Sequence, residues 1–210
     1  MKLKKYQKLK NALKKAIKEA DLGIRGVKIA SVIAEALHEI DIDPVLVGGA
    51  AVAFYSDGRY VTEDIDMLAP SGPDVQEVME ELGFSRFGKD YINKELNIYV
   101  EFPGSSLGPT ERAIVIKVGD VDLKIVSIED LIIDRLNAFK YWKSAVDGVN
   151  ALNMLELGIG DEGRIINRAR EDDVLDALDY IRGVLRKVIR QKINPQLASE
   201  LLMAYFKKQP

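Results

Sequence analysis

The spacing of apolar residues changes once along this chain, and that change limits the folds it can adopt. Up to about residue 126, short apolar runs alternate with polar residues or end in glycine, which predicts strands connected by helices. From Ser127 onward apolar residues recur every three or four positions, which predicts helices alone. We therefore expect an α/β (α+β) protein, with a mixed β-sheet and flanking helices in residues 1–126 and a helical bundle in residues 127–210.

Local signals place the expected elements of the first part. Gly119 begins a two-residue turn between strand-like runs, which is typical of a β-hairpin. Gly83 closes a helix that follows a proline-containing turn, whereas Gly23 and Gly26 are expected to end the first helix of the chain. The expected elements are helices over residues 2–20, 29–40, 50–55 and 74–83, and strands over residues 45–47, 63–69, 97–102, 113–118 and 121–126.

The second part follows the last of these strands without a linker. No Pro, Gly or long polar stretch separates the strand from the helix that begins near Ser127. Domains that move independently are usually joined by such a stretch. We therefore expect residues 127–210 to pack as one wall of a cleft rather than as an independent domain.

Composition excludes several kinds of site. The chain has no Cys and one His, which rules out disulfides, thiolate zinc sites and cysteine nucleophiles and argues against a serine triad. No apolar run approaches the roughly 18 residues that span a bilayer, and the lysine-rich start lacks the apolar stretch of a secretory signal. We expect a cytoplasmic protein that binds no membrane and whose chemistry uses carboxylates, Lys, Arg, hydroxyls or backbone groups.

Charge is distributed unevenly. Residues 1–20 contain eight Lys and one Glu, a balance of +7, so the net charge of −3 leaves −10 for the remainder. An acidic body argues against a broad nucleic-acid-binding surface, although the basic start could hold an anion locally. Because apolar residues recur at helical spacing between the lysines, we favour the solvated face of an amphipathic helix.

The tripeptide Asp-Ile-Asp occurs twice, and its second copy is the better placed for chemistry. Asp41 and Asp43 precede the strand at 45–47, at the edge opposite to the one where ligands of open α/β sheets bind, so they are expected to be turn and capping residues. Asp64 and Asp66 lie inside a strand and point to one face of the sheet. Two such carboxylates repel each other unless a cation neutralises them, and all-oxygen ligation suits Mg²⁺ or Mn²⁺.

Two further features would complete such a site. Gly48 and Gly49 end one strand and open a helix, where backbone N–H groups suit a phosphate. Glu101 is the candidate third acid, because its apolar neighbours match those of the aspartate pair better than the neighbours of Asp122 do. A phosphate beside carboxylate-bound metal indicates nucleotide chemistry.

The order of these features resembles a known family. A strand ending in two glycines, a helix, and then Arg59 and Thr62 ahead of the second Asp-Ile-Asp are similar to the core motif of the minimal nucleotidyltransferases of the DNA polymerase β superfamily. Residues 45–68 carry the resemblance, and the strand around Glu101 matches the third-acid strand. The branch that the chain resembles most is the one that includes abortive-infection toxin-type nucleotidyltransferases.

A weaker resemblance extends through the helices to about residue 155. In the family a basic residue precedes a loop acid in this segment. On that match Arg135 or Lys140 is the basic position and Asp147 is the loop acid. The resemblance therefore adds two candidate nucleotide-binding cations from the helical part.

The resemblance implies a nucleotidyltransferase-like fold and transfer of a nucleoside monophosphate from a nucleoside triphosphate to an acceptor, with release of pyrophosphate. Asp64, Asp66 and Glu101 would be the catalytic residues and would bind Mg²⁺ or Mn²⁺, and Glu101 would also activate the acceptor hydroxyl. The implied acceptor is RNA, a protein hydroxyl or a small molecule. The implied nucleotide-binding residues are Gly48, Gly49, Arg59, Thr62, Arg135 and Lys140.

One departure from the family leaves an alternative open. Many members have Ser or Thr after the glycine pair, where the hydroxyl can contact phosphate, but this chain has Ala50 and Ala51. The alternative is a non-catalytic module on the same fold that binds a nucleotide, RNA or a partner protein, for example within a toxin–antitoxin pair. The three acids favour the enzyme, because converging carboxylates cost stability unless a metal uses them.

Overall fold

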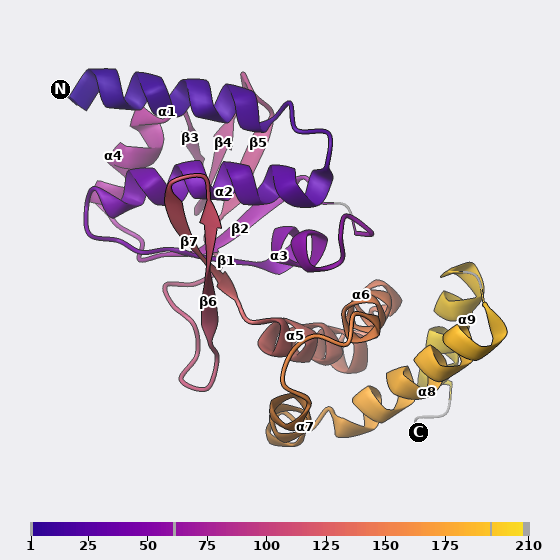
Figure 1. Cartoon of the computed structure of the whole chain (residues 1–210). Helices are drawn as coiled ribbons and strands as arrows, with labels where there is room; N and C mark the ends of the chain where they lie inside the picture. Colours follow the sequence, from indigo (N-terminus) through magenta and orange to yellow (C-terminus); the bar gives the residue numbers. More distant parts are fainter. Residues whose placement is uncertain (1, 61, 194, 208–210) are drawn as a thin grey trace. The chain divides into compact units, whose positions relative to one another are not determined.

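The computed structural model describes residues 2–60, 62–193 and 195–207, and the chain divides into two units. Met1–Ser127 contains the β-sheet with its helices, and Ile128–Pro210 is helical (Figure 1). The expected α/β (α+β) class, a mixed sheet with flanking helices followed by a set of helices, is confirmed.

The strands of the described residues form one mixed seven-stranded sheet in the order β3-β4-β5-β2-β1-β7-β6. The parallel neighbours are β1 with β7 and β2 with β5, and the other neighbours are antiparallel. The sheet thus brings β2 and β5 together although a helix and a hairpin separate them in sequence. The strands are β1 (Val45–Val47), β2 (Asp64–Leu68), β3 (Ser85–Phe87), β4 (Asp90–Asn93), β5 (Ile98–Glu101), β6 (Ala113–Val118) and β7 (Val121–Val126).

One face of the two central neighbours β2 and β5 belongs to the core. Ile65, Met67 and Val100 are at most 3% exposed, whereas the residues that alternate with them are half-buried or exposed. α2 packs on this apolar face, as shown by the 3.6 Å between the Ile65 Cδ1 and a Cβ placed on Gly26. The opposite face of β2 and β5 is left for polar side chains. The helices of this unit are α1 (Lys2–Ala16), α2 (Leu22–His38), α3 (Gly48–Tyr55) and α4 (Pro73–Glu81) (Figure 1).

The prediction that Gly23 and Gly26 end the first helix is wrong. α1 ends at Ala16, and α2 begins after Asp21, whose Oδ1 accepts a hydrogen bond from the Ile24 N–H at 3.0 Å. Both glycines lie inside α2. A Cβ at Gly23 would lie 2.6 Å from the carbonyl oxygen of Ala53, so these glycines allow α2 to approach α3 closely rather than break the helix.

The strands β3 and β4 were not among the expected elements. The three residues of β3 are all exposed, so this edge strand has no buried face and gives no alternating apolar pattern. β4 follows after a turn at Gly88, which has a φ of +65°. Short strands of this kind are recognised only by the neighbour with which they pair.

The second unit contains five helices within its described residues. Its core includes Leu136, Phe139, Leu178 and Ile181, all fully or almost fully buried. No helix in the described part of the chain is long and apolar enough to cross a membrane. The helices are α5 (Ile128–Tyr141), α6 (Ala145–Glu156), α7 (Glu162–Glu171), α8 (Leu175–Gln191) and α9 (Pro195–Phe206).

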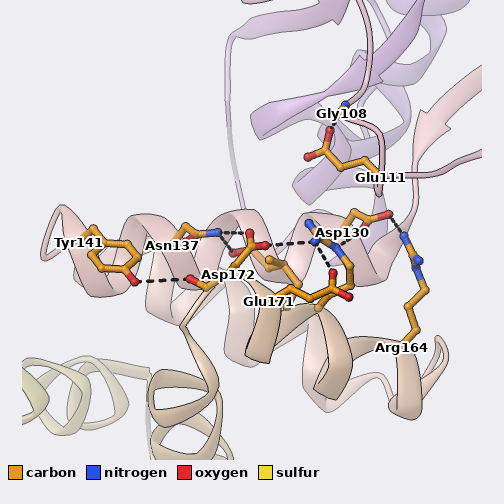
Figure 2. A network of polar contacts seen from close by, with 10 residues as sticks. Gly108, Glu111, Asp130, Asn137, Tyr141, Arg164, Glu171 and Asp172 are labelled. Carbon is orange, nitrogen blue, oxygen red and sulfur yellow. Dashed lines mark hydrogen bonds and ion pairs between the residues drawn. The ribbon is translucent and has the colours of Figure 1, made fainter.

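A buried ionic network connects α5 with α7 in this unit (Figure 2). The side chain of Asp130 has no exposed surface, and its carboxylate accepts hydrogen bonds from Arg164 at 2.6 Å and Arg168 at 3.2 Å. Arg168 also donates to Asp172 at 3.1 Å, and Asp172 accepts from the Asn137 amide at 2.9 Å. Asp130, in the first turn of α5, thus pairs with two guanidinium groups of α7.

Candidate active site

Three of the candidate acids lie on the polar face of the sheet. β2 and β5 are parallel neighbours, with Asp66 directly opposite Glu101 and Asp64 directly opposite Tyr99. Neighbouring strands are about 4.8 Å apart, so side chains of opposed residues on one face lie next to each other. The register therefore groups Asp64, Asp66 and Glu101 on one surface, although residues 69–97 separate the two strands in sequence.

Electrostatics shows that these carboxylates act on one another. Burial is the largest cause of the raised pKa of Glu101, and the charges of Asp66, Asp90 and Asp64 raise it further. Lys89 opposes them only weakly. The face therefore concentrates negative charge.

Asp90 is an acid of this face that the sequence reasoning missed. The pairing of Tyr91 with Val100, continued by one residue, places Asp90 opposite Glu101. Asp90 is 8% exposed, its Oδ2 accepts a hydrogen bond from the Tyr99 hydroxyl at 3.1 Å, and its buried Oδ1 has no partner among the described residues. The only available signal was a short run of strand-forming residues after Gly88, so Asp90 could not be assigned to a face before its strand was known.

The glycine pair closes directly on the acidic strand. Gly48 has a φ of +60°, and a Cβ placed there would lie 2.0 Å from Asp66 Oδ2. The Gly49 N–H donates a hydrogen bond to the same oxygen at 3.2 Å. The glycine pair therefore contacts Asp66. The Gly49 amide, one of the two expected to bind phosphate, donates to Asp66 in this structure.

Three further residues from the sequence analysis lie in different environments: Thr62, Arg59 and Ala50. The Thr62 hydroxyl accepts a hydrogen bond from the Asp64 N–H at 3.3 Å, and a Cβ at Gly49 would meet Thr62 at 3.0 Å. Arg59 is exposed in the turn after α3. Ala50 is 1% exposed and faces Gly26 of α2, where a Cβ would come within 3.1 Å of the Ala50 Cβ. Ala50 is therefore a helix-packing position.

Arg135 and Lys140 lie on α5 in the second unit, and both bind carboxylates of that unit. Arg135 contacts Asp134 and donates to Asp147 at 2.8 Å, and Lys140 donates to Asp176 at 2.9 Å. The prediction that Asp147 lies in a loop is wrong. Ser144 caps α6 by accepting a hydrogen bond from the Asp147 N–H at 3.3 Å, which places Asp147 in the first turn of that helix.

The first Asp-Ile-Asp lies at the other end of the strands, as expected. Asp41 has a φ of 56° in the turn after α2, and Asp43 binds Lys124 at 2.7 Å and His38 at 3.2 Å. Asp122, the alternative third acid, binds Lys117 at 2.7 Å near the start of β7. Asp43 and Asp122 are therefore paired with basic side chains.

The donor set of the polar face fits a hard divalent cation in its chemistry. Every candidate ligand is a carboxylate oxygen, which is what Mg²⁺ and Mn²⁺ prefer. Among residues 2–60, 62–193 and 195–207, however, no group of three or more His, Asp or Glu is already arranged to hold a metal ion. The side chains of Asp64, Asp66 and Glu101 would have to rotate to share one.

Comparison with known proteins identifies the type of fold. No protein-family model matches the chain, and no curated protein matches its sequence. Among solved structures it is similar to an antigenic nucleotidyltransferase-like protein from Paracoccidioides brasiliensis, with a TM-score of 0.55 and 19% identity over 86% of this chain and 92% of that chain. At this identity the similarity shows the fold, so the chain has a nucleotidyltransferase-like fold.

Proposed function

We propose that this protein is a metal-dependent nucleotidyltransferase, related to the toxin-type branch of the DNA polymerase β superfamily, that moves a nucleoside monophosphate from a nucleoside triphosphate to an acceptor. The pairing of Asp66 with Glu101 supports this most directly, on the face that also carries Asp64. A structural role does not require like charges opposite each other, since they destabilise a sheet. A cation bound during function would offset the repulsion between Asp66 and Glu101.

In the proposed reaction, an acceptor hydroxyl oxygen forms a bond to the α-phosphorus, and the bond from that phosphorus to the bridging oxygen breaks. Pyrophosphate leaves with the electron pair, and the hydroxyl proton passes to Glu101. Asp64, Asp66 and Glu101 would hold Mg²⁺ or Mn²⁺, which when bound neutralises phosphate charge. The Gly48 turn would position the phosphates, with Thr62 supporting the backbone at Asp64.

The proposed nucleotide-binding cations lie in different parts of the chain. Arg59 is exposed and next to the acidic strand in sequence. Arg135 and Lys140 hold carboxylates of the second unit, so each would have to exchange a carboxylate for a phosphate to bind the nucleotide. Their contribution to affinity would be reduced by the loss of those ion pairs.

A non-catalytic module that binds a nucleotide or a partner protein is the second candidate. Two observations favour it: Ala50 is buried and offers no hydroxyl, and the Gly49 amide donates to Asp66. Both reduce the number of contacts available to a triphosphate. This module would bind nucleotide, RNA or a partner protein of a toxin–antitoxin pair without transfer.

The test compares the two Asp-Ile-Asp segments. With Mg²⁺ or Mn²⁺ and each of the four nucleoside triphosphates, we expect pyrophosphate release or label transfer to one member of a panel of RNA, protein and small-molecule acceptors. Asp64→Asn keeps the size of the side chain but removes one charge, so it should abolish transfer and leave folding intact or slightly improved. Asp41→Asn is the matched control, since Asn also tolerates a φ of 56°.

Three outcomes separate the candidates. Equal loss of transfer in both variants would show that the segments were misassigned. Metal-dependent nucleotide binding without transfer to any acceptor would favour the non-catalytic module. Absence of metal-dependent binding would end the nucleotidyltransferase hypothesis.

A further inference from the structure

A cavity lies at the carboxyl ends of β2 and β5, on the side of the core helices. It has a volume of about 610 Å³ and is lined by residues 69–73 at the start of α4, by Arg86 and Lys89 of the β3–β4 hairpin, and by Tyr91 and Phe102. Small-molecule sites usually occupy about 300–1,000 Å³. None of the proposed catalytic or nucleotide-binding residues lines this cavity.

The lining of the cavity is cationic in an acidic protein. Arg86 and Lys89 are its charged residues, and no Asp or Glu of the described chain lines it, although the sequence has 33 acidic residues. Arg86 is held in place, because its Nε donates to the Gly88 carbonyl at 3.0 Å and its Nη1 donates to Gln76 at 3.1 Å. A cation fixed in this way loses little side-chain entropy on binding an anion.

Tyr91 contributes a hydroxyl donor to the same cavity. The residue is 6% exposed, and its hydroxyl has no hydrogen-bond partner within the described residues. Burial raises the pKa of Tyr91, so the hydroxyl keeps its proton at neutral pH. Its ring meets the Phe102 ring edge-on, with centroids 5.7 Å apart. The hydroxyl can therefore donate to an acceptor in the cavity without giving up a hydrogen bond within the protein.

We propose that this cavity binds a small organic phosphate, whose phosphate contacts Arg86, Lys89 and the Tyr91 hydroxyl and whose ring or other apolar part packs against Phe102. Two cations and a hydroxyl donor match a dianion better than a single carboxylate. The site requires neither metal nor triphosphate, so its binding is measured without the proposed transfer.

The binding test uses the full chain in a chelator, without triphosphate, and follows backbone amide shifts by NMR. The probes are phenyl phosphate, phenol and inorganic phosphate. We expect phenyl phosphate to shift the amides of Ala69, Ser71, Gly72 and residues 86–91. It should bind at least about tenfold more tightly than either fragment, because it gains both the ionic and the apolar contacts. The Asp64→Asn variant should bind it unchanged.

Point variants locate the site. Lys89→Ala should weaken phenyl phosphate binding about tenfold and Tyr91→Phe about threefold, through loss of a charged contact and of one donor. Lys94→Ala is the matched control, because Lys94 is also an exposed lysine that flanks β4 but does not line the cavity. Thermal unfolding confirms that each variant is folded. Shifts outside the cavity, no binding at millimolar probe, or equal affinities of Lys89→Ala and Lys94→Ala would each overturn the proposal.

Discussion

At Gly48 the backbone has a φ of +60°, and an added methyl group would lie 2.0 Å from Asp66 Oδ2. Gly48→Ala therefore combines backbone strain with a clash, and we expect a loss of unfolding free energy well above the roughly 1 kcal/mol of strain alone. Gly119→Ala is the control, because Gly119 has a φ of +62° and open space around it. Chemical denaturation of both variants measures the difference, and equal losses would show that the turn does not close on Asp66.

The raised pKa of Glu101 predicts that stability depends on pH with a sign that is unusual for a carboxylate. Burial and the charges of Asp66, Asp90 and Asp64 raise its pKa in the folded protein. Its contribution to stability is therefore present at low pH and is lost as the pH rises through the folded pKa. Glu101→Gln cannot ionise, so in metal-free buffer it should be more stable than the parent at neutral pH, and the difference should vanish in acid.

Glu95→Gln is the matched control for this measurement. The hydrogen bond from Lys14, at 2.7 Å, lowers the pKa of Glu95, so its contribution is present at neutral pH and is lost as the pH falls through the folded pKa. Glu95→Gln should therefore be no more stable than the parent at neutral pH. Thermal midpoints across the pH range test both variants, and a shift of the same sign in both would contradict the electrostatic account of the acidic face.

At the scale of elements, the contact between α2 and α3 depends on glycines inside a helix. A Cβ at Gly23 would lie 2.6 Å from the Ala53 carbonyl oxygen, which belongs to the backbone and cannot easily move. Gly23→Ala should therefore destabilise the protein, although Ala favours a helix by about 1 kcal/mol over Gly. Gly183→Ala in α8, where the nearest atom is a flexible Arg186 nitrogen at 3.9 Å, should stabilise it instead. Denaturation midpoints that move in the same direction would show that the packing argument is wrong.

The glycines of α2 also show what local pattern can and cannot predict about elements. The hairpin at Gly119, the strand β2 and the helices α3 and α4 were all predicted correctly, because their signals are turn residues and apolar periodicity within one short segment. A glycine, however, can either mark the end of a helix or allow a close contact inside one, and the local sequence does not distinguish the two. Gly23 is identified as a close-contact glycine only by its neighbour α3, which belongs to a later part of the sequence.

At the scale of the whole chain, we expect the second unit to depend on Asp130. Its side chain is fully buried and binds both Arg164 and Arg168. Asp130→Asn removes the carboxylate charge that the two arginines share, although Arg168 keeps Asp172, and should cost roughly 3 kcal/mol or more. Asp173→Asn is the control, because the Asp173 side chain is 89% exposed and Asn accepts its φ of 54°. Circular dichroism at the helical band follows both variants, and a similar small loss in each would show that the network contributes little.

The sequence by itself determined the α/β class, the point where strands give way to helices, and the faces on which Asp64, Asp66 and Glu101 lie. These follow from periodicity, which is a local property of the chain. Only the tertiary structure decided that Asp66 stands opposite Glu101, that Gly48 closes on Asp66 and that Asp90 joins the same face. Strand order and register arise from pairing between segments that are distant in sequence, and the energies that select one pairing belong to the assembled sheet rather than to either strand alone.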